Sequence, residues 1–251
     1  MSLPVRFSHL RAYGRSAMHG RLSRDKEAAQ TREMQRGTAV DALIFGTRKV
    51  CGYPGPVRRG KEYDAFCLEH EDFEILTSAE YAKARAMADA VLDCKLAQPL
   101  LQGVQQQTIF FRWMGLDCRS TPDVRGPDYL TELKTASSSD PYRAPWHFRK
   151  LAYHAQLMMQ SIAVGLDGAH HMPENHYIVC VESSEPYPVT CFHVEPRALL
   201  EGEKLLITWA ERLKNCEASN VYPPYIDCIV PFDVPEEEPD FVFGDDTEEV
   251  A

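Results

Sequence analysis

The chain has 251 residues and a formal net charge of −10, with 44% hydrophobic and 25% charged residues. These proportions are ordinary for a soluble globular protein and exclude collagen-like, low-complexity and small disulfide-rich classes. Because no apolar stretch approaches the roughly 20 residues of a membrane helix, and the basic N-terminus lacks the apolar segment of a secretory signal, we expect a cytoplasmic protein.

The charge is unevenly distributed along the chain. Residues 1–61 carry 13 Lys and Arg against 4 Asp and Glu, a net charge of +9, whereas the remainder carries 14 against 33, or −19. A basic N-terminal third can offer a phosphate-facing surface on an otherwise acidic protein. Residues 231–251 hold nine acidic residues and no basic one, which predicts a disordered acidic tail.

The first hundred residues are predicted to be mainly helical. The distribution of apolar residues over 25–45 favours a helix, and the Gly-, Pro- and basic-rich residues 46–62 predict a loop. Thr77 followed three residues later by Glu80 is a capping box, which predicts that a helix begins there and covers residues 78–96.

The following residues predict a sheet with helices around it. Three extended stretches joined by tight turns, at residues 108–114, 116–123 and 129–135, favour an antiparallel meander. A helix, two strands and a last helix are expected at residues 146–164, 176–182, 188–194 and 197–215. The fold class is therefore α/β, with a central mixed β-sheet flanked by helices. We expect one domain over residues 1–230, made of a basic part (1–100), a core (105–195) and the C-terminal helix, followed by the tail.

The residues with the clearest chemistry are Asp123, after a proline, and Glu132-Leu133-Lys134 after the next turn. Positions i and i+2 of a strand share one face, so Glu132 and Lys134 project together while Leu133 enters the core. Asp123 can meet Glu132 across the sheet, where two carboxylates repel unless a divalent cation such as magnesium neutralises them. A water on that cation, oriented by Lys134, can attack a phosphodiester. Alone, Glu-x-Lys is common and more often a solvated ion pair.

The predicted helix over 146–164 carries a polar stripe. Arg149, Tyr153, Gln156 and Gln160 fall at i, i+4, i+7 and i+11, on one helix face. A glutamine there can hold a phosphate or orient a water, although a solvated face has the same pattern. His154 lies beside the stripe, and a lone histidine is more often structural.

These motifs, PD…ELK followed by YHAQ (residues 153–156), resemble the PD-(D/E)XK nuclease superfamily. Within it, the chain is similar to RecE-type exonucleases of prophages and to nuclease domains related to RecB and phage lambda exonuclease. Residues 37–43 resemble the family's GTxxH helix motif, residues 74–91 its intervening helix, and residues 182–189 its last strands. The resemblance covers most of residues 8–228 and implies a restriction-endonuclease-like core.

The resemblance also implies a role for each matched residue. The metal ligands would be Asp123, Glu132 and the backbone carbonyl of Leu133. Lys134 would orient or activate the attacking water. Gln156 would be the family's glutamine near the site, and Tyr153 and His154 would be supporting residues.

At three places the chain departs from the family pattern. Asp41 stands where the family usually has a metal-binding histidine, and we expect it to remain a ligand because carboxylates also bind magnesium. The acid that usually precedes the PD motif is replaced by Gln106 or Gln107. The tyrosine expected four residues after Gln156 is Gln160.

The activity implied by the resemblance is 5′-to-3′ exonucleolytic digestion of linear double-stranded DNA in phage-type recombination. It implies Mg²⁺ as cofactor, with Mn²⁺ able to substitute, a ring-shaped homo-oligomer that encloses DNA, and a single-strand annealing protein as partner.

Three alternatives stay open. The first is an endonuclease of the same superfamily. The second is a CRISPR-associated nuclease with an iron–sulfur cluster, but the C-terminal cysteines at 180, 191, 216 and 228 are too widely spaced, so no cluster is expected. The third, favoured by the departures at Asp41, Gln106 and Gln160, is a decayed nuclease fold that binds DNA or protein.

Several arginines and lysines are candidates for contacts to DNA phosphates, although exposed loop arginines are often only solvated. The candidates are Arg21, Arg24, Arg48, Lys49, Arg58, Arg59 and Lys61 in the basic third, and Arg149 on the polar stripe.

Overall fold

The computed structural model describes residues 3–26, 31–167 and 171–232, so the predicted tail lies almost wholly outside the described residues. The helices are α1 (Phe7–Arg15), α2 (Ala17–Asp25), α3 (Arg32–Phe45), α4 (Lys61–Glu69), α5 (Ser78–Asp93), α6 (Ala97–Leu100), α7 (Ala144–Leu151), α8 (Tyr153–Leu166) and α9 (Pro196–Ser219). The strands are β1 (Lys49–Tyr53), β2 (Phe73–Thr77), β3 (Val104–Gln105), β4 (Ile109–Trp113), β5 (Leu116–Ser120), β6 (Val124–Arg125), β7 (Tyr129–Ala136), β8 (Asn175–Glu182) and β9 (Val189–His193).

The central sheet is mixed, as the sequence predicts. Its strand order is β3-β6-β7-β8-β9. Strand β7 pairs in parallel with β8 and antiparallel with β6. The longest pairing in this sheet, β7 with β8, runs through its middle and carries the Glu132-Leu133-Lys134 segment.

The predicted three-stranded meander is wrong in one respect. Strands β4 and β5 pair with each other as a separate two-stranded sheet, and only the short β6 joins β7. The chain leaves β5 at Ser120 and passes through Pro122, whose missing N–H cannot continue a ladder. The break lets Asp123 enter the central sheet independently of the β4–β5 hairpin.

The residues predicted as a loop, 46–62, contain strand β1, which pairs in parallel with β2. The glycines and prolines that suggested a loop lie mostly after Tyr53. The local signal for β1 is weak because its partner begins twenty residues later, after α4. In contrast, the capping box is confirmed: the Thr77 amide donates to Glu80 Oε2 at 3.0 Å, and the Glu80 amide donates to Thr77 Oγ1 at 3.2 Å.

The predicted single helix over 146–164 is two helices, α7 and α8. They are separated at Ala152, whose backbone is left-handed (φ 57°, ψ 39°). That conformation is unfavourable for a residue with a Cβ, and neither glycine nor proline marks the break. As a consequence, Arg149 belongs to a different helix from Tyr153, Gln156 and Gln160, so the polar stripe begins at Tyr153.

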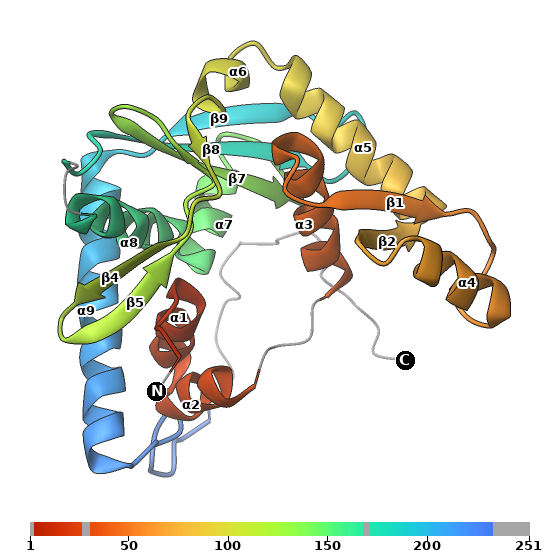
Figure 1. Cartoon of the computed structure of the whole chain (residues 1–251). Coiled ribbons are helices and arrows are strands. Elements are labelled where there is room, and N and C mark those ends of the chain that lie inside the picture. The colour runs from red at the N-terminus through yellow and green to blue at the C-terminus, as the bar shows by residue number, and fades with distance from the viewer. Residues whose placement is uncertain (1–2, 27–30, 168–170, 233–251) are drawn as a thin grey trace.

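Helices cover the central sheet on both faces (Figure 1). Leu130 and Ala136 of β7 pack in one core with residues of α1, α8 and α9, whereas Leu133 packs in a second core with residues of α3 and α5. Helix α9 lies directly on α8, because a Cβ added to Gly202 would be 2.7 Å from the His154 carbonyl oxygen. Helix α8 is thus packed between α9 and the face of β7 that carries Glu132 and Lys134.

Among the described helices, none is both long enough and apolar enough to cross a membrane.

Candidate active site

The side chains of β7 alternate between the two cores and set the site. Glu132 and Lys134 lie on the same face as Leu130 and Ala136, toward α8, whereas Leu133 is buried in the opposite core. Alternation along a strand therefore brings one acid and one amine together beneath α8. Glu132 is 3% exposed, so its charge requires polar partners.

Asp123 is held against β7 immediately before β6 begins. Its Oδ2 accepts a hydrogen bond from the Leu133 amide at 2.8 Å, and its Oδ1 accepts one from Gln106 Nε2 at 2.9 Å. Of the two glutamines considered for the place of the family's acid, Gln106 makes this contact, whereas Gln107 accepts a bond from Arg125. The hydrogen bond to Leu133 places the Asp123 carboxylate next to the Glu132 position.

Three donors surround the Glu132 carboxylate. Lys134 Nζ donates to Oε1 at 2.6 Å, Gln156 Nε2 donates to the same oxygen, and Gln160 Nε2 donates to Oε2 at 2.6 Å. Gln156 and Gln160 are four residues apart and therefore lie on one face of α8. The sequence identified Gln160 only as a departure from the family pattern and as a member of the polar stripe; it missed the contact with Glu132.

Tyr153 and His154 lie on different sides of α8. The Lys134 ammonium is 4.6 Å from the centroid of the Tyr153 ring, a cation–π distance that helps to hold the amine. His154 instead lines an apolar cavity of about 300 Å³ with Phe148 and Arg149. Burial lowers the pKa of His154. The structure thus brings Tyr153, but not His154, to the acid pair.

Helix α3 adds a third carboxylate. A Cβ on Gly37 would lie 3.2 Å from Thr135 Oγ1, which shows how closely α3 approaches β7 one turn before Asp41. Burial and the charge of Glu132 raise the pKa of Asp41 to about 7, although Lys134 opposes the shift. Asp41 thus interacts electrostatically with Glu132 and Lys134, and its role as a metal ligand stays a prediction.

The cluster has an excess of negative charge. Burial raises the pKa of Asp123 well above its usual value, and the charges of Glu132 and Asp41 add to the shift. Burial alone would lower the pKa of Lys134, but Glu132 and Asp123 outweigh it, so the pKa is raised and the ammonium persists. One cation among three acids leaves a net charge of −2 when all are ionised, an environment that attracts a further cation.

This donor set fits a magnesium-like ion. Within the described ranges, no three His, Cys, Asp or Glu side chains already converge as a metal cage, because Glu132 is turned toward Lys134 and two glutamines. Mg²⁺ does not require such a cage, since it is commonly bound by one or two carboxylates together with waters and substrate phosphates. The carboxylates of Asp123 and Glu132 meet that requirement.

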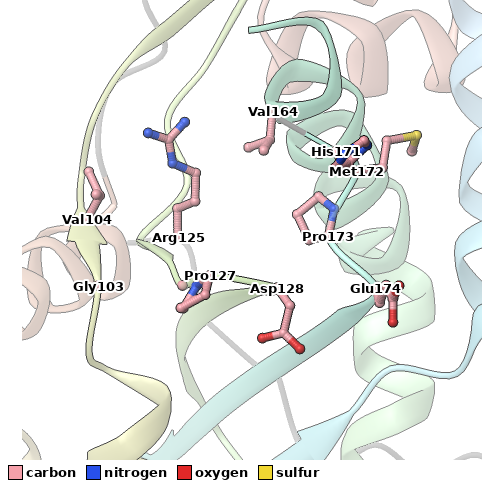
Figure 2. A pocket seen from close by; sticks show the side chains of 11 residues that line it. Gly103, Val104, Arg125, Pro127, Asp128, Val164, His171, Met172, Pro173 and Glu174 are labelled. Atoms are coloured by element: carbon pink, nitrogen blue, oxygen red, sulfur yellow. The ribbon is translucent and has the colours of Figure 1, made fainter. Parts of the chain in front are cut away.

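A sizeable cavity lies elsewhere in the molecule. It has a volume of about 580 Å³ and is lined by the β6–β7 turn and by residues 171–174. Figure 2 shows Val104 and Arg125 on one side and Met172 and Pro173 on the other. Asp128 at this cavity and Lys134 are six residues apart along the chain, roughly 20 Å in an extended strand. None of Asp41, Asp123, Glu132 and Lys134 lines this cavity.

Two of the candidate DNA-binding arginines make contacts between helices. Arg24 pairs with Glu217 of α9 at 3.6 Å, and the Arg21 guanidinium lies 4.5 Å from the centroid of the Tyr222 ring. These contacts join α2 to the end of α9 and to the residues after it. A role in DNA binding remains a prediction for both residues.

The basic candidates between residues 48 and 61 lie around β1 and α4. Arg58 donates to the Ile75 carbonyl at 3.2 Å, and Lys49 Nζ lies 5.3 Å from the centroid of the Phe73 ring. Arg48 is close enough to Glu74 to oppose the rise in its pKa caused by burial. For these residues, as for Arg59 and Arg149, contact with DNA stays a prediction.

Comparisons with known proteins agree with the fold. No curated protein matches the sequence significantly. A crystal structure from Eubacterium rectale named "Putative exonuclease" is 12% identical, with a TM-score of 0.65 over 92% of this chain and 91% of its own. A structure named SSO0001 (12% identity, 80% of this chain, 84% of its own, TM-score 0.30) is too different to support an argument. The model of a family described as "PDDEXK-like domain of unknown function (DUF3799)" matches residues 7–229, and the chain belongs to that family.

Proposed function

We propose that this protein is a divalent-metal-dependent deoxyribonuclease. The observation that supports the proposal is the meeting of Asp123, Glu132 and Lys134, with Asp41 beside them, at one buried point of the central sheet. A buried group of acids with one retained ammonium is costly to fold. Because the family has a PDDEXK-like fold, a role in catalysis explains why this chain keeps the buried group of acids.

Each residue of the site has a separate role in the proposed reaction. Asp123 and Glu132 would hold Mg²⁺, or Mn²⁺ in its place, with the Leu133 carbonyl and Asp41 as further oxygen ligands. When bound, such an ion stabilises negative charge on a phosphoryl oxygen and makes water more acidic. Lys134 orients the attacking water and stabilises charge at the scissile phosphate. Gln156 and Gln160 keep the Glu132 carboxylate oriented.

The finer assignment is an exonuclease that digests linear double-stranded DNA from the 5′ end in phage-type recombination. Its support is the sequence resemblance to RecE-type enzymes and the exonuclease name of the Eubacterium rectale structure. A ring-shaped homo-oligomer enclosing the DNA would reconcile a net charge of −10 with a polyanionic substrate. A single-strand annealing partner and a cytoplasmic location belong to the same proposal.

The test uses end-labelled linear duplex DNA and closed circular DNA, each with and without Mg²⁺. The proposal predicts magnesium-dependent release of nucleotides from linear ends and intact circles. Nicked circles would show an endonuclease of the same superfamily instead. DNA that is bound but not cleaved under any of these conditions would show a decayed nuclease fold and overturn the enzyme assignment. Comparing 5′-labelled with 3′-labelled duplexes fixes the direction.

A further inference from the structure

Two large aromatic side chains are exposed where the chain leaves the sheet for α7. Tyr142 is 85% exposed and Trp146 is 50% exposed, four residues apart across the start of the helix. The opposite face of α7 is well packed, because Ala144 and Phe148 are buried in the core. Helix α7 packs on the core through Ala144 and Phe148, while Tyr142 and half of the Trp146 side chain are exposed to solvent.

The backbone around these aromatics is held firmly. The Ser139 amide donates to Glu182 Oε2 at 3.0 Å, and Ser139 Oγ donates to the Pro188 carbonyl at 3.1 Å. The Tyr142 amide donates to Asp140 Oδ1 at 2.7 Å. A surface whose backbone is fixed before binding loses little conformational entropy when a ligand arrives.

The charge around the aromatics is positive in an acidic protein. Residues 140–166 contain Arg143, Arg149 and Lys150 against Asp140 alone, a net charge of +2 within a chain of −10. We name Tyr142, Arg143, Trp146, Arg149 and Lys150 the α7 surface. Exposed aromatics among cations suit single-stranded nucleic acid, whose unpaired bases stack on aromatic rings while its phosphates meet Arg and Lys. An apolar protein partner would gain nothing from the cations.

The buried face of α7 contacts a residue that lies beside the acid cluster. Along the chain, α7 follows β7, which carries Glu132 and Lys134, and precedes α8, which carries the two glutamines. Phe148 of α7 contacts Tyr153 with ring centroids 5.5 Å apart, and Tyr153 in turn faces Lys134. The α7 surface lies on the opposite, exposed side of the same helix, so a strand bound there is separated from Tyr153 and the acid cluster by about the width of one helix, roughly 10 Å.

We infer that the α7 surface binds unpaired nucleotides at the end of the strand that enters the site, by stacking bases on Tyr142 and Trp146. This inference rests on the proposed nuclease function and specifies its substrate: a duplex end that is frayed or carries a single-stranded overhang. In intact duplex DNA the bases are already stacked on one another, so a blunt, stable end offers no free face to these rings.

The test is fluorescence anisotropy without divalent metal, using labelled single strands, blunt duplexes and overhang duplexes of matched sequence. The double variant Tyr142→Ala/Trp146→Ala should bind single strands and overhangs at least about 10-fold more weakly, because stacking contributes roughly 1–3 kcal/mol per base. Its blunt-duplex affinity should change less than about twofold. Tyr142→Phe/Trp146→Phe should restore most of the loss, since a phenyl ring still stacks.

The matched control is Tyr225→Ala, an exposed aromatic that contacts Arg15 and His19 instead of α7, and it should bind all three probes like the wild type. Equal weakening for blunt and overhang duplexes, or unchanged overhang binding, would overturn the inference. A magnesium cleavage assay on the same proteins separates the two proposals. If the wild type cleaves DNA but the double variant binds overhangs normally, only the inference about the α7 surface is refuted. If the double variant loses overhang binding selectively but the wild type does not cleave DNA, only the proposed nuclease function is refuted.

Discussion

Gln160 of α8 donates a hydrogen bond of 2.6 Å to Oε2 of Glu132 on β7, while its own Oε1 is buried without a partner among the described residues. Gln160 is 1% exposed, so its amide cannot turn to solvent. A neutral amide can orient a carboxylate without cancelling its charge, which leaves Glu132 available to a cation. The residue that departs from the family's tyrosine therefore keeps a donor at the acid pair.

We predict that Gln160→Leu lowers the single-turnover rate of DNA cleavage by about 10- to 100-fold, because a hydrogen bond to a charged group contributes about 1.5–3 kcal/mol. The Mg²⁺ concentration for half-maximal rate should rise, since Glu132 loses its orientation. Ser161→Ala is the matched control: Ser161 is the next residue of α8, its hydroxyl is buried without a partner among the described residues, and its loss should change neither value. A Gln160→Leu rate within twofold of the wild type would contradict the assigned contact.

Asp41 offers a test of the third carboxylate. Without metal at pH 8, we expect Asp41→Asn to unfold at a higher temperature than the wild type, because burial and the charge of Glu132 disfavour the ionised Asp41 carboxylate. Adding Mg²⁺ should raise the unfolding temperature of the wild type more than that of Asp41→Asn, since a ligand stabilises the state that binds it.

The control for this experiment is Glu33→Gln, an exposed acid at the start of the same helix, which should respond to Mg²⁺ like the wild type. Equal magnesium-induced stabilisation of the Asp41→Asn variant and the wild type would remove Asp41 from the metal site.

Much of the fold could be predicted because its signals are local. Strand alternation fixed the direction of Glu132 and Lys134, and the Thr77–Glu80 capping box fixed the start of α5. The order of the motifs also indicated a PD-(D/E)XK-like domain, as the family model confirms, whereas the RecE-type assignment stays a prediction. For the strand and the capping box, residues close in the sequence carry the whole signal.

The features that were missed depend on distant residues. Strand β1 is stabilised by pairing with β2, and the separation of β4–β5 from the central sheet follows from tertiary pairing. The left-handed Ala152 ends α7 without glycine or proline. The hydrogen bond between Gln160 and Glu132 joins residues 28 positions apart, so only the packing of α8 on β7 reveals it.

His176 on β8 predicts a pH dependence of stability. It is 3% exposed, both ring nitrogens lack partners among the described residues, and burial, with a smaller effect from His193, lowers its pKa from 6.5 to about 4. Between these two values the unfolded chain binds the proton and the folded chain does not, so this contribution to stability is lost as the pH falls from 6.5 toward 4. The whole loss is about 3 kcal/mol.

Urea denaturation at pH 7 and pH 4 measures this contribution. Replacing the ring in His176→Leu should reduce the loss of unfolding free energy on acidification by an amount of that order. His171→Leu, at an exposed histidine, should keep the wild-type pH dependence. If His176→Leu and the wild type lose the same free energy on acidification, His176 is not the titrating group.

The most direct test of the account is the rate of phosphodiester cleavage by Lys134→Ala in saturating Mg²⁺, compared with the wild type and with Lys214→Ala, an exposed lysine on α9. Far-UV circular dichroism should show the same helix content in all three proteins. We predict that Lys134→Ala cleaves linear DNA at least about 10³-fold more slowly, while Lys214→Ala cleaves normally. A Lys134→Ala rate near that of the wild type would contradict the claim that the Asp123, Glu132 and Lys134 cluster is the active site.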